Sequence, residues 1–427
     1  MDKKEKVAIA GVTIAGLTGL GLYLYLRSKK VSAVSTLTPT TGVTTTSTGI
    51  TTTPTSPTPT TSYPVPITYF TSPMPIVASP TPTATSPILQ NISLTITTVS
   101  GSSVTLTNQD PEAEIPPSPQ YNLTMSNAEP NTTYVIQGVV VCPDSEPSYV
   151  SSHITTDSTG SGQATLQPMC PSPELMFAVY GPGIAYQFLA YSSTPVEIPA
   201  SYGEIIGPIT SDILLQIDSP QVLVVAVGGG GGGGGANSNG GNGGDTIVTN
   251  GYQIIYAYGG QGGVSTSIWF DNASTASGGS GLAENVQYYR ILNGNSGGAA
   301  TIYSSTGGQG AALPSGYQQA IQQVLQEATG INYSIPLTIP STPCQPPVYG
   351  QYGGSPARGF GAGGCGQAVS GEGGGGGGSG GIVVALMNGG TFFIVVGQGG
   401  QPAGGTSQCP TGCDQGMPGV VYLIPLP

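Results

Sequence analysis

Charged side chains are scarce in this 427-residue sequence, and basic ones are nearly absent after the first 30 residues. Charged residues make up 7% of the chain, compared with about 25% in an average globular protein. Beyond Lys30 the only basic residues are Arg290 and Arg358, whereas eighteen of the 20 acidic residues lie there. Nucleic acids are bound through clustered Lys and Arg, so this composition excludes them as partners. The low charge indicates an extracellular protein that tolerates acid, because few carboxylates are present to change their ionisation.

Side chains that carry out catalysis are equally rare. His153 is the only histidine, and the absence of lysine from the body excludes a P-loop or a Schiff-base site. Residues 294–298 match G-x-S-x-G, but the strand-to-helix context of a nucleophile elbow is missing. Asp110, Glu112 and Glu114 could bind Ca²⁺, although the prolines between and after them favour a solvated loop. We therefore expect no enzyme activity, no cofactor and no metal site.

A long apolar run without charge lies at the amino terminus. Residues 1–6 are short and basic, and Val7–Leu26 contains no charged residue before a second basic cluster. Such a run is long enough to cross a bilayer, so we expect a transmembrane helix at 7–26 with residues 1–6 inside. A cleaved signal peptide is the alternative, although its apolar region is usually shorter. Gly11, Ala15 and Gly19 would line one face of this helix and favour self-association.

Residues 27–88 have too few apolar side chains to form a core. Thr, Ser and Pro dominate, as in residues 51–62, and no charge occurs between Val31 and Gln109. Proline favours an extended conformation. We expect a stalk with O-linked glycans.

Alternating apolar and polar residues begin near residue 89. Ile92–Thr97 alternates regularly, and further short runs of this kind continue to about residue 199, separated by turn residues. Short strands at this spacing predict a β-sandwich, and the turns around 127–134 and 156–160 resemble those of Ig-like modules.

The six cysteines are an even number, as expected for disulfides in an oxidising environment. Cys142 and Cys170 both fall in the predicted sandwich and are expected to pair. The pairing of the other four is left open, and a four-cysteine zinc site is a weaker alternative because paired C-x-x-C motifs are absent. These four are Cys344, Cys365, Cys409 and Cys413.

N-glycosylation sequons are present across the body of the chain, and they matter only if that body is outside the cell. They begin at Asn91, Asn122, Asn131, Asn272 and Asn332.

The rest of the chain, residues 200–427, is organised around glycine. The apolar run Val222–Val227 leads into Gly228–Gly235, and two β-rich runs joined by Asn250-Gly251 follow. The same order of poly-Gly, Asn-Gly between apolar runs, and Gly-Gln-Gly-Gly recurs with Gly373–Gly378 and Asn388-Gly389. Asn-Gly between β-rich runs predicts a hairpin. The sequence therefore predicts two related halves, each with one hairpin, in a single glycine-rich β domain.

One helix is predicted between these halves. An apolar stripe with helical spacing runs from Tyr317 to Ala328. Ser315 and Gln318 match a capping box, and Gly330 is placed to end the helix.

The order of apolar strand, poly-Gly, hairpin and G-x-G-G resembles the glycine-rich domains of phage tail-fibre adhesins. The resemblance covers about half the chain. It implies that the glycine segments pack side by side as polyproline-II-like helices, which is possible only without a Cβ. We also expect binding specificity to lie in the loops that the glycines hold up. The best contact candidates are the aromatic side chains Trp269, Phe270, Tyr288 and Tyr289, and packing in the core is the equal alternative for each.

Taken together, these features predict a mainly β, membrane-anchored surface glycoprotein without catalytic activity. A virion spike, vertex or receptor-binding protein of an archaeal virus fits this layout, and a cellular adhesin or an S-layer or pilus component is the alternative. We expect its partners to be the lipid membrane through residues 7–26, other coat or surface proteins, and a host receptor or glycan. Self-association would give a trimer by analogy with fibres, or a pentamer at a vertex.

Overall fold

A computed structural model describes residues 91–427, with gaps at 144, 146, 169, 185–186, 200, 236–237, 266–274, 301–306, 347–354, 370–371 and 406–411. The described chain is mainly β, as predicted, and belongs to one compact unit. Its strands are ordered in several sheets, and α2 (Tyr317–Thr329) is the only α-helix among the described residues.

The predicted fold class, which included an N-terminal transmembrane helix, requires correction. Helix α2 has 13 residues, so its length is about 20 Å, whereas a bilayer core is about 30 Å thick. No helix within the described ranges is long and apolar enough to span a membrane. The expected membrane helix at 7–26 and stalk at 27–88 lie outside the described residues.

The amino-terminal strands form two sheets that face each other. The first sheet has the order β2-β1-β4-β7, and the second has the order β3-β9-β8-β5-β6. Side chains from both, including Leu94, Leu123, Tyr134 and Phe177, share one buried core. The strand bounds are β1 (Ser93–Thr98), β2 (Ser103–Thr107), β3 (Glu112–Glu114), β4 (Tyr121–Ser126), β5 (Thr133–Val141), β6 (Ser148–Thr155), β7 (Gly162–Leu166), β8 (Glu174–Tyr180) and β9 (Phe188–Tyr191).

A larger sheet begins after the sandwich. Its main path is β11-β22-β12-β21-β13-β14-β15, with β10 also paired to β12 and β16 to β21. The strand bounds are β10 (Val196–Ile198), β11 (Ile206–Ile209), β12 (Ile213–Val227), β13 (Thr246–Thr249), β14 (Ile254–Ala257), β15 (Gly281–Glu284), β16 (Tyr288–Leu292), β21 (Ile382–Val395) and β22 (Val420–Leu426). Short pairs elsewhere are β17 (Ser341–Thr342) with β18 (Arg358–Gly359) and β19 (Ala368–Val369) with β20 (Glu372–Gly373).

The two longest strands bend and thereby divide this sheet into two layers. Strands β12 and β21 pair along both halves, with an irregularity between Ile217 and Gln221. In β21, Val383 and Phe392 point into the core between the layers. Leu386 faces a second core under α2, and Phe393 faces a third core shared with the sandwich. Both faces of each layer are covered, so side chains on both faces of these strands are buried. Their sequences are therefore continuous apolar runs.

The second predicted hairpin is not present. Residues on both sides of Asn388-Gly389 pair with β12, not with each other, so this dipeptide is the bend of one long strand. A Cβ on Gly389 would lie 1.5 Å from the carbonyl oxygen of Ser219. Glycine is therefore required here for the close approach of two bent strands. Asn250-Gly251, in contrast, does connect the antiparallel strands β13 and β14.

Helix α2 covers the outer layer through the predicted stripe, with Ile321, Val324 and Leu325 buried. Gly330 ends it in the left-handed conformation, as predicted. The predicted capping box is wrong: Gly316 is the N-cap and no side chain caps the helix. Gln318 instead donates its amide hydrogen to the carbonyl of Leu337, because segment 335–339 packs in the same core as α2.

Candidate functional site

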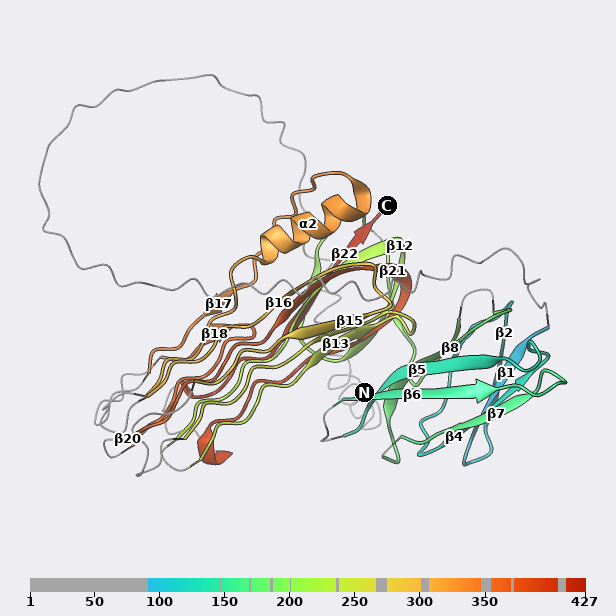
Figure 1. Ribbon diagram of the computed structural model, residues 1–427, viewed down its shortest axis with the longest axis horizontal. Helices are drawn as coiled ribbons and strands as arrows, with labels where there is room; N and C mark the ends of the chain where they lie inside the picture. The colour runs from blue at the N-terminus through green and yellow to red at the C-terminus, as the bar shows by residue number, and fades with distance from the viewer. Residues whose placement is uncertain are drawn as a thin grey trace, which may run out of the picture. The chain divides into compact units, whose positions relative to one another are not determined.

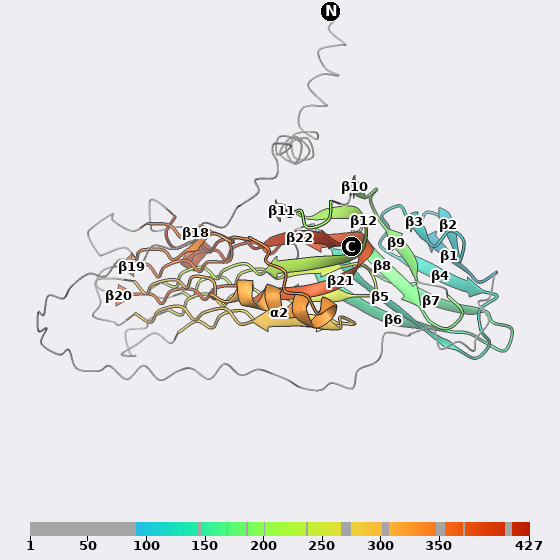
Figure 2. The ribbon, with the colours of Figure 1, turned by 90° about the horizontal axis from the view of Figure 1, so that it is seen from above.

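The glycine segments leave the sheet and run side by side as a bundle, which Figures 1 and 2 show in two views. The run Gly228–Gly235 lies inside this bundle and is fully buried. Its N–H groups point in turn to three neighbouring segments. Gly228, Gly231 and Gly234 donate to the carbonyls of one segment, 375–381. The residues between them donate to segments 241–244 and 414–417.

This order has a period of three, which is the period of a polyproline-II helix. The carbonyls of the same run accept hydrogen bonds from three other segments. Gly260 and Gly263 donate from one, Gly364 and Gln367 from a second, and residues 400 and 403 from a third. The run is therefore surrounded by neighbours on every side, as the resemblance implied.

The second run, 374–381, has the same surroundings. Its N–H groups donate to segments 361–367, 258–264 and 295–298, and its carbonyls accept from segments 228–234, 279 and 308–311. A Cβ on Gly377 would lie 2.2 Å from the carbonyl oxygen of Gly231. Only glycine fits at these close approaches, which explains why the two longest glycine runs of the sequence occupy the interior of the bundle.

The outer segments follow a looser pattern in which every third residue is polar and exposed. Asn242, Gln261, Gln309 and Gln398 occupy such positions after pairs of glycines or between them. These residues are exposed because the period of three turns the same face of the segment outward each time. This Gly-Gly-X periodicity is the sequence signal that could have identified the outer segments, and the sequence analysis missed it.

One outer row of N–H groups is capped by side chains. Asn239, Asn242 and Asp245 are spaced by three residues, and their Oδ1 atoms accept hydrogen bonds from Ser265, Gly262 and Gly259. The distances are 2.8 Å, 2.9 Å and 2.8 Å, respectively. Side-chain oxygens thus replace the carbonyls of an absent neighbouring segment.

Burial raises the pKa of Asp245, while its hydrogen bond from the Gly259 N–H acts in the opposite direction. Burial likewise raises the pKa of Asp212, whose Oδ1 accepts the Val396 N–H at 2.8 Å. A carboxyl with a raised pKa in the folded state stabilises the fold fully below its unfolded pKa of about 4. That contribution is lost as the pH rises through the folded pKa.

We therefore expect Asp245→Asn to raise the melting temperature at pH 7 by a few degrees and to leave it nearly unchanged at pH 3.5. The amide keeps an Oδ1 acceptor for Gly259 and removes the buried charge. Melting curves across this pH range test the expectation, with the exposed Asp218→Asn as the matched control. A lower melting temperature of Asp245→Asn at pH 7 would contradict it.

The bundle brings several chain reversals to its far end, where the second glycine run begins. Around Gly234, the N–H of Gln367 donates to the Gly234 carbonyl, and Gly234 donates to Gly375. Val264 accepts from Gly375 within the same group. We call this far end of the bundle the loop end. The described flanks of these reversals meet there, at residues 235 and 238–240, 264–265 and 275–276, 298 and 307–308, 367–369 and 372–374, and 403–405 and 412–413.

Two of the four predicted aromatic contacts fall within the described residues. Trp269 and Phe270 lie outside the described residues, in a stretch whose described flank Ser265 belongs to the loop end. Tyr288 and Tyr289 are on β16, which pairs with β21 beyond the sheet end of the bundle. Tyr288 packs against the core under α2, whereas Tyr289 is 37% exposed.

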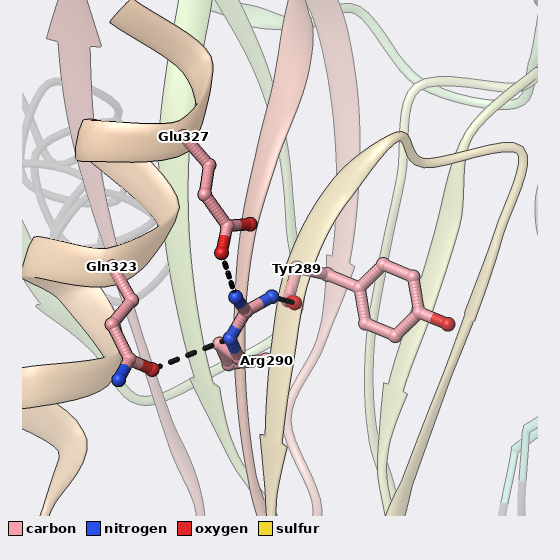
Figure 3. A network of polar contacts seen from close by, with 4 residues as sticks. All are labelled: Tyr289, Arg290, Gln323 and Glu327. Carbon is pink, nitrogen blue, oxygen red and sulfur yellow. Dashed lines mark hydrogen bonds and ion pairs between the residues drawn. The ribbon is translucent and has the colours of Figure 1, made fainter. Parts of the chain in front are cut away.

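Figure 3 shows the Tyr289 ring directed away from α2, while its carbonyl accepts a hydrogen bond from Arg290 at 2.7 Å. Arg290 also forms an ion pair with Glu327 and donates from Nε to the Oε1 of Gln323 at 3.3 Å. One of the two basic residues of the body therefore fastens the helix to the sheet.

The described residues contain two complete cysteine pairs that form disulfides, and four of the five sequon asparagines are exposed. Cys142 and Cys170 are bonded, as expected, and Cys344 is bonded to Cys365. Cys413 is buried and disulfide-bonded, and Cys409 lies outside the described residues. Asn91, Asn122, Asn131 and Asn332 are exposed, and Asn272 lies outside the described residues.

No catalytic or metal-binding arrangement is found in the described ranges. His153 is exposed on β6, and no group of three His, Cys, Asp or Glu side chains there is arranged to hold a metal ion. Glu112 and Glu114 accept hydrogen bonds from Thr391 and Thr194.

Comparison with known proteins identifies the glycine-rich part. No curated protein and no solved structure matches the chain. Residues 207–355 match a family model described as a glycine-rich domain. This range covers the first glycine run and α2 but ends before the second run, which completes the bundle. Residues 207–355 are therefore similar to the glycine-rich domain that this model describes.

Proposed function

We propose that this chain is a non-enzymatic surface adhesin whose glycine bundle presents the loop end to a receptor. The observation that supports this proposal most directly is the position of the chain reversals. Two buried glycine runs hold them together at one end of a rigid, closely hydrogen-bonded scaffold. Binding residues are often carried on loops positioned by such a scaffold.

The chemistry of the body agrees with a binding role. Its exposed surface is rich in amide and hydroxyl side chains and poor in charge, and only Arg290 and Arg358 are basic. A protein or glycan receptor suits such a surface better than a polyanion does. The resemblance to phage tail-fibre adhesins favours a spike, vertex or receptor-binding protein of a virion, and the expected membrane anchor favours an archaeal virus. A cellular adhesin or an S-layer or pilus component is the second candidate.

The proposal is tested by attachment of the labelled full-length chain to cells of candidate hosts. We expect the double variant Trp269→Ala, Phe270→Ala to reduce attachment about tenfold or more, as loss of central aromatic anchors does. Tyr202→Ala is the matched control, because Tyr202 is 60% exposed but lies beside Pro425 at the sheet end. Equal attachment of both variants would remove the loop end from the binding site.

The same assay examines Tyr289, a predicted contact that is exposed in the described part of the chain. Loss of attachment with Tyr289→Ala alone would move the receptor site to β16. Gold-labelled antibodies against the chain, imaged on isolated particles and on cells, separate the virion from the cell surface. Native mass measurement distinguishes the proposed trimer or pentamer from a monomer.

A further inference from the structure

A threonine hydroxyl, a glutamine amide and a carboxylate meet on one face of the large sheet. Gln216 of β12 and Thr391 of β21 are direct partners in the antiparallel register. The Oγ1 of Thr391 is in hydrogen-bond contact with the Oε1 of Gln216, and it lies 3.1 Å from the Oε2 of Glu112 on β3. Three side chains that are remote from one another in sequence therefore converge on one hydroxyl oxygen.

The backbone itself brings these groups together. Side chains directly opposite each other in an antiparallel pair have Cβ atoms about 4.5–5.5 Å apart. Phe393, two residues after Thr391, faces the core shared with the sandwich, so Thr391 and its partner Gln216 point to that side as well. Glu112 is the register partner of Leu189, which packs in the same core from the sandwich. The carboxylate therefore approaches the pair from the sandwich.

The Thr391 hydroxyl has more acceptors than hydrogens. A hydroxyl carries one hydrogen, so Thr391 can donate to only one of its two acceptors at a time. When that hydrogen is directed to Glu112, a lone pair of the Oγ1 is free to face the Gln216 amide. The carbonyl carbon Cδ of this amide is bonded to the Oε1 that Thr391 contacts. The three groups are thus arranged as a nucleophile, its base and an acyl carbon.

The surroundings favour a reaction between these groups. Thr391 is only 2% exposed, so the protein keeps most water away from its hydroxyl. Exclusion of water protects an ester from hydrolysis. Two reacting groups held in the right geometry behave as if their concentration were about 10⁵–10⁸ M. An amide that is unreactive toward alcohols in solution can therefore react at this position.

We propose that Thr391 and Gln216 form an intramolecular ester bond that crosslinks β12 to β21. The Oγ1 of Thr391 forms a bond to the Cδ of Gln216, and the bond between that Cδ and Nε2 breaks. Glu112 accepts the hydroxyl proton and passes it to the departing nitrogen, which leaves as ammonia. The reaction needs no oxidant, reductant or other reactant. Ammonia diffuses away and is protonated at neutral or acid pH, which opposes the reverse reaction.

The crosslink lies beside the bend of the two longest strands. The register between β12 and β21 is irregular between Ile217 and Gln221, directly after Gln216. A covalent bond at this place holds the two strands together where their ladder of hydrogen bonds is interrupted. The inference does not depend on the loop end or on the proposed receptor site.

The few basic residues of the body provide a direct test. Trypsin cleaves after Arg290 and Arg358, so the reduced and denatured full-length chain yields Gln216 in fragment 31–290 and Thr391 in fragment 359–427. We expect these two fragments to stay joined in one product and to separate after mild alkali, which hydrolyses esters. In chain produced without glycans, the mass of the reduced protein is expected to be about 17 Da too low, the mass of one ammonia.

Three variants assign the roles. Thr391→Val is expected to give separate fragments and the full mass. Thr391→Ser keeps a hydroxyl and is expected to retain the joined product, which distinguishes loss of the nucleophile from a failure to fold. Glu112→Gln is expected to slow the appearance of the joined product after synthesis about 100-fold or more, because it removes the base.

Thr165→Val is the matched control. Thr165 on β7 contacts the side-chain oxygen of its register partner Asn122 on β4, at 3.4 Å on the exposed face of the sandwich. It therefore removes a threonine hydroxyl from another cross-strand pair with an amide. We expect this variant to be joined to the same extent as the parent.

Two results would overturn the proposal. The first is a parent chain that has its full mass and gives separate tryptic fragments. The second is a loss of ammonia that persists in Thr391→Val, because a succinimide at Asn250-Gly251 or Asn388-Gly389 also releases ammonia without joining the fragments. A Glu112→Gln protein that is joined as fast as the parent would overturn the role assigned to that carboxylate.

Discussion

Gly231→Ala is expected to lower the free energy of unfolding by about 3 kcal/mol, at the upper end of what overpacking in a core usually costs. A Cβ at this position would lie 2.0 Å from the carbonyl oxygen of Gln261 and 2.4 Å from its carbonyl carbon. That backbone is held by its own hydrogen bonds to Ser277 and Gly378. It cannot move aside without disrupting the neighbouring segments.

The same outcome is expected for Gly377→Ala, because its Cβ would meet the carbonyl of Gly231. Gly241→Ala is the matched control. Gly241 is also in the bundle, but it is exposed, and the nearest atom to its Cβ would be the Gln401 nitrogen at 3.2 Å. We expect this variant to cost less than 1 kcal/mol, close to the effect of an ordinary surface substitution.

Chemical denaturation of the three full-length variants measures these differences. Equal stability of Gly231→Ala and the parent would mean that the glycine run does not pack as described. A large loss of stability in Gly241→Ala alone would mean that glycine is required for its backbone conformation and not for the close approach of neighbouring segments.

Removing the disulfide between Cys142 and Cys170 is expected to cost roughly 3 kcal/mol. The bond closes a loop of 28 residues in sequence. Cys142 follows β5, and Cys170 precedes β8. These strands pair with each other in the sheet that faces both the sandwich core and the glycine-rich region. Without the bond, the conformational entropy of the unfolded chain rises, whereas the folded state gains no compensating interaction.

Denaturation of the double variant Cys142→Ser, Cys170→Ser measures this cost. The double variant Cys344→Ser, Cys365→Ser is the companion, and its loop of 21 residues predicts a similar loss. Peptide mapping of the unreduced parent provides an independent check. Free thiols at 142 and 170, or a bond from either to another cysteine, would contradict the pairing.

Local patterns in the sequence predicted the features whose cause is local. Alternation predicted β1, the apolar stripe predicted α2 to its end at Gly330, and the Asn250-Gly251 turn predicted the β13–β14 hairpin. Each depends on the geometry of neighbouring residues along the chain. The pairing of Cys142 with Cys170 was also within reach, since both fall in one run of short strands.

Features that depend on distant partners were missed or mistaken. Asn388-Gly389 has the same local signal as Asn250-Gly251, but β12 lies beside the chain on both sides of it and makes it a bend. Ser315 has the chemistry of a helix cap, yet Gly316 holds that position and Gln318 bonds to Leu337. In each case, a partner remote in sequence overrides the local preference.

Some features of the glycine bundle follow from local sequence patterns, and others follow only from contacts between distant segments. Repetition along the sequence already indicated that the glycine runs are ordered, and the resemblance to phage tail-fibre domains implied close side-by-side packing, which only residues without a Cβ allow. Which segments surround Gly231 follows from the tertiary structure alone. A poly-Gly run carries no side chain to specify its neighbours. Their identity is set by the strands at one end of the bundle, whose pairing register fixes where each segment begins.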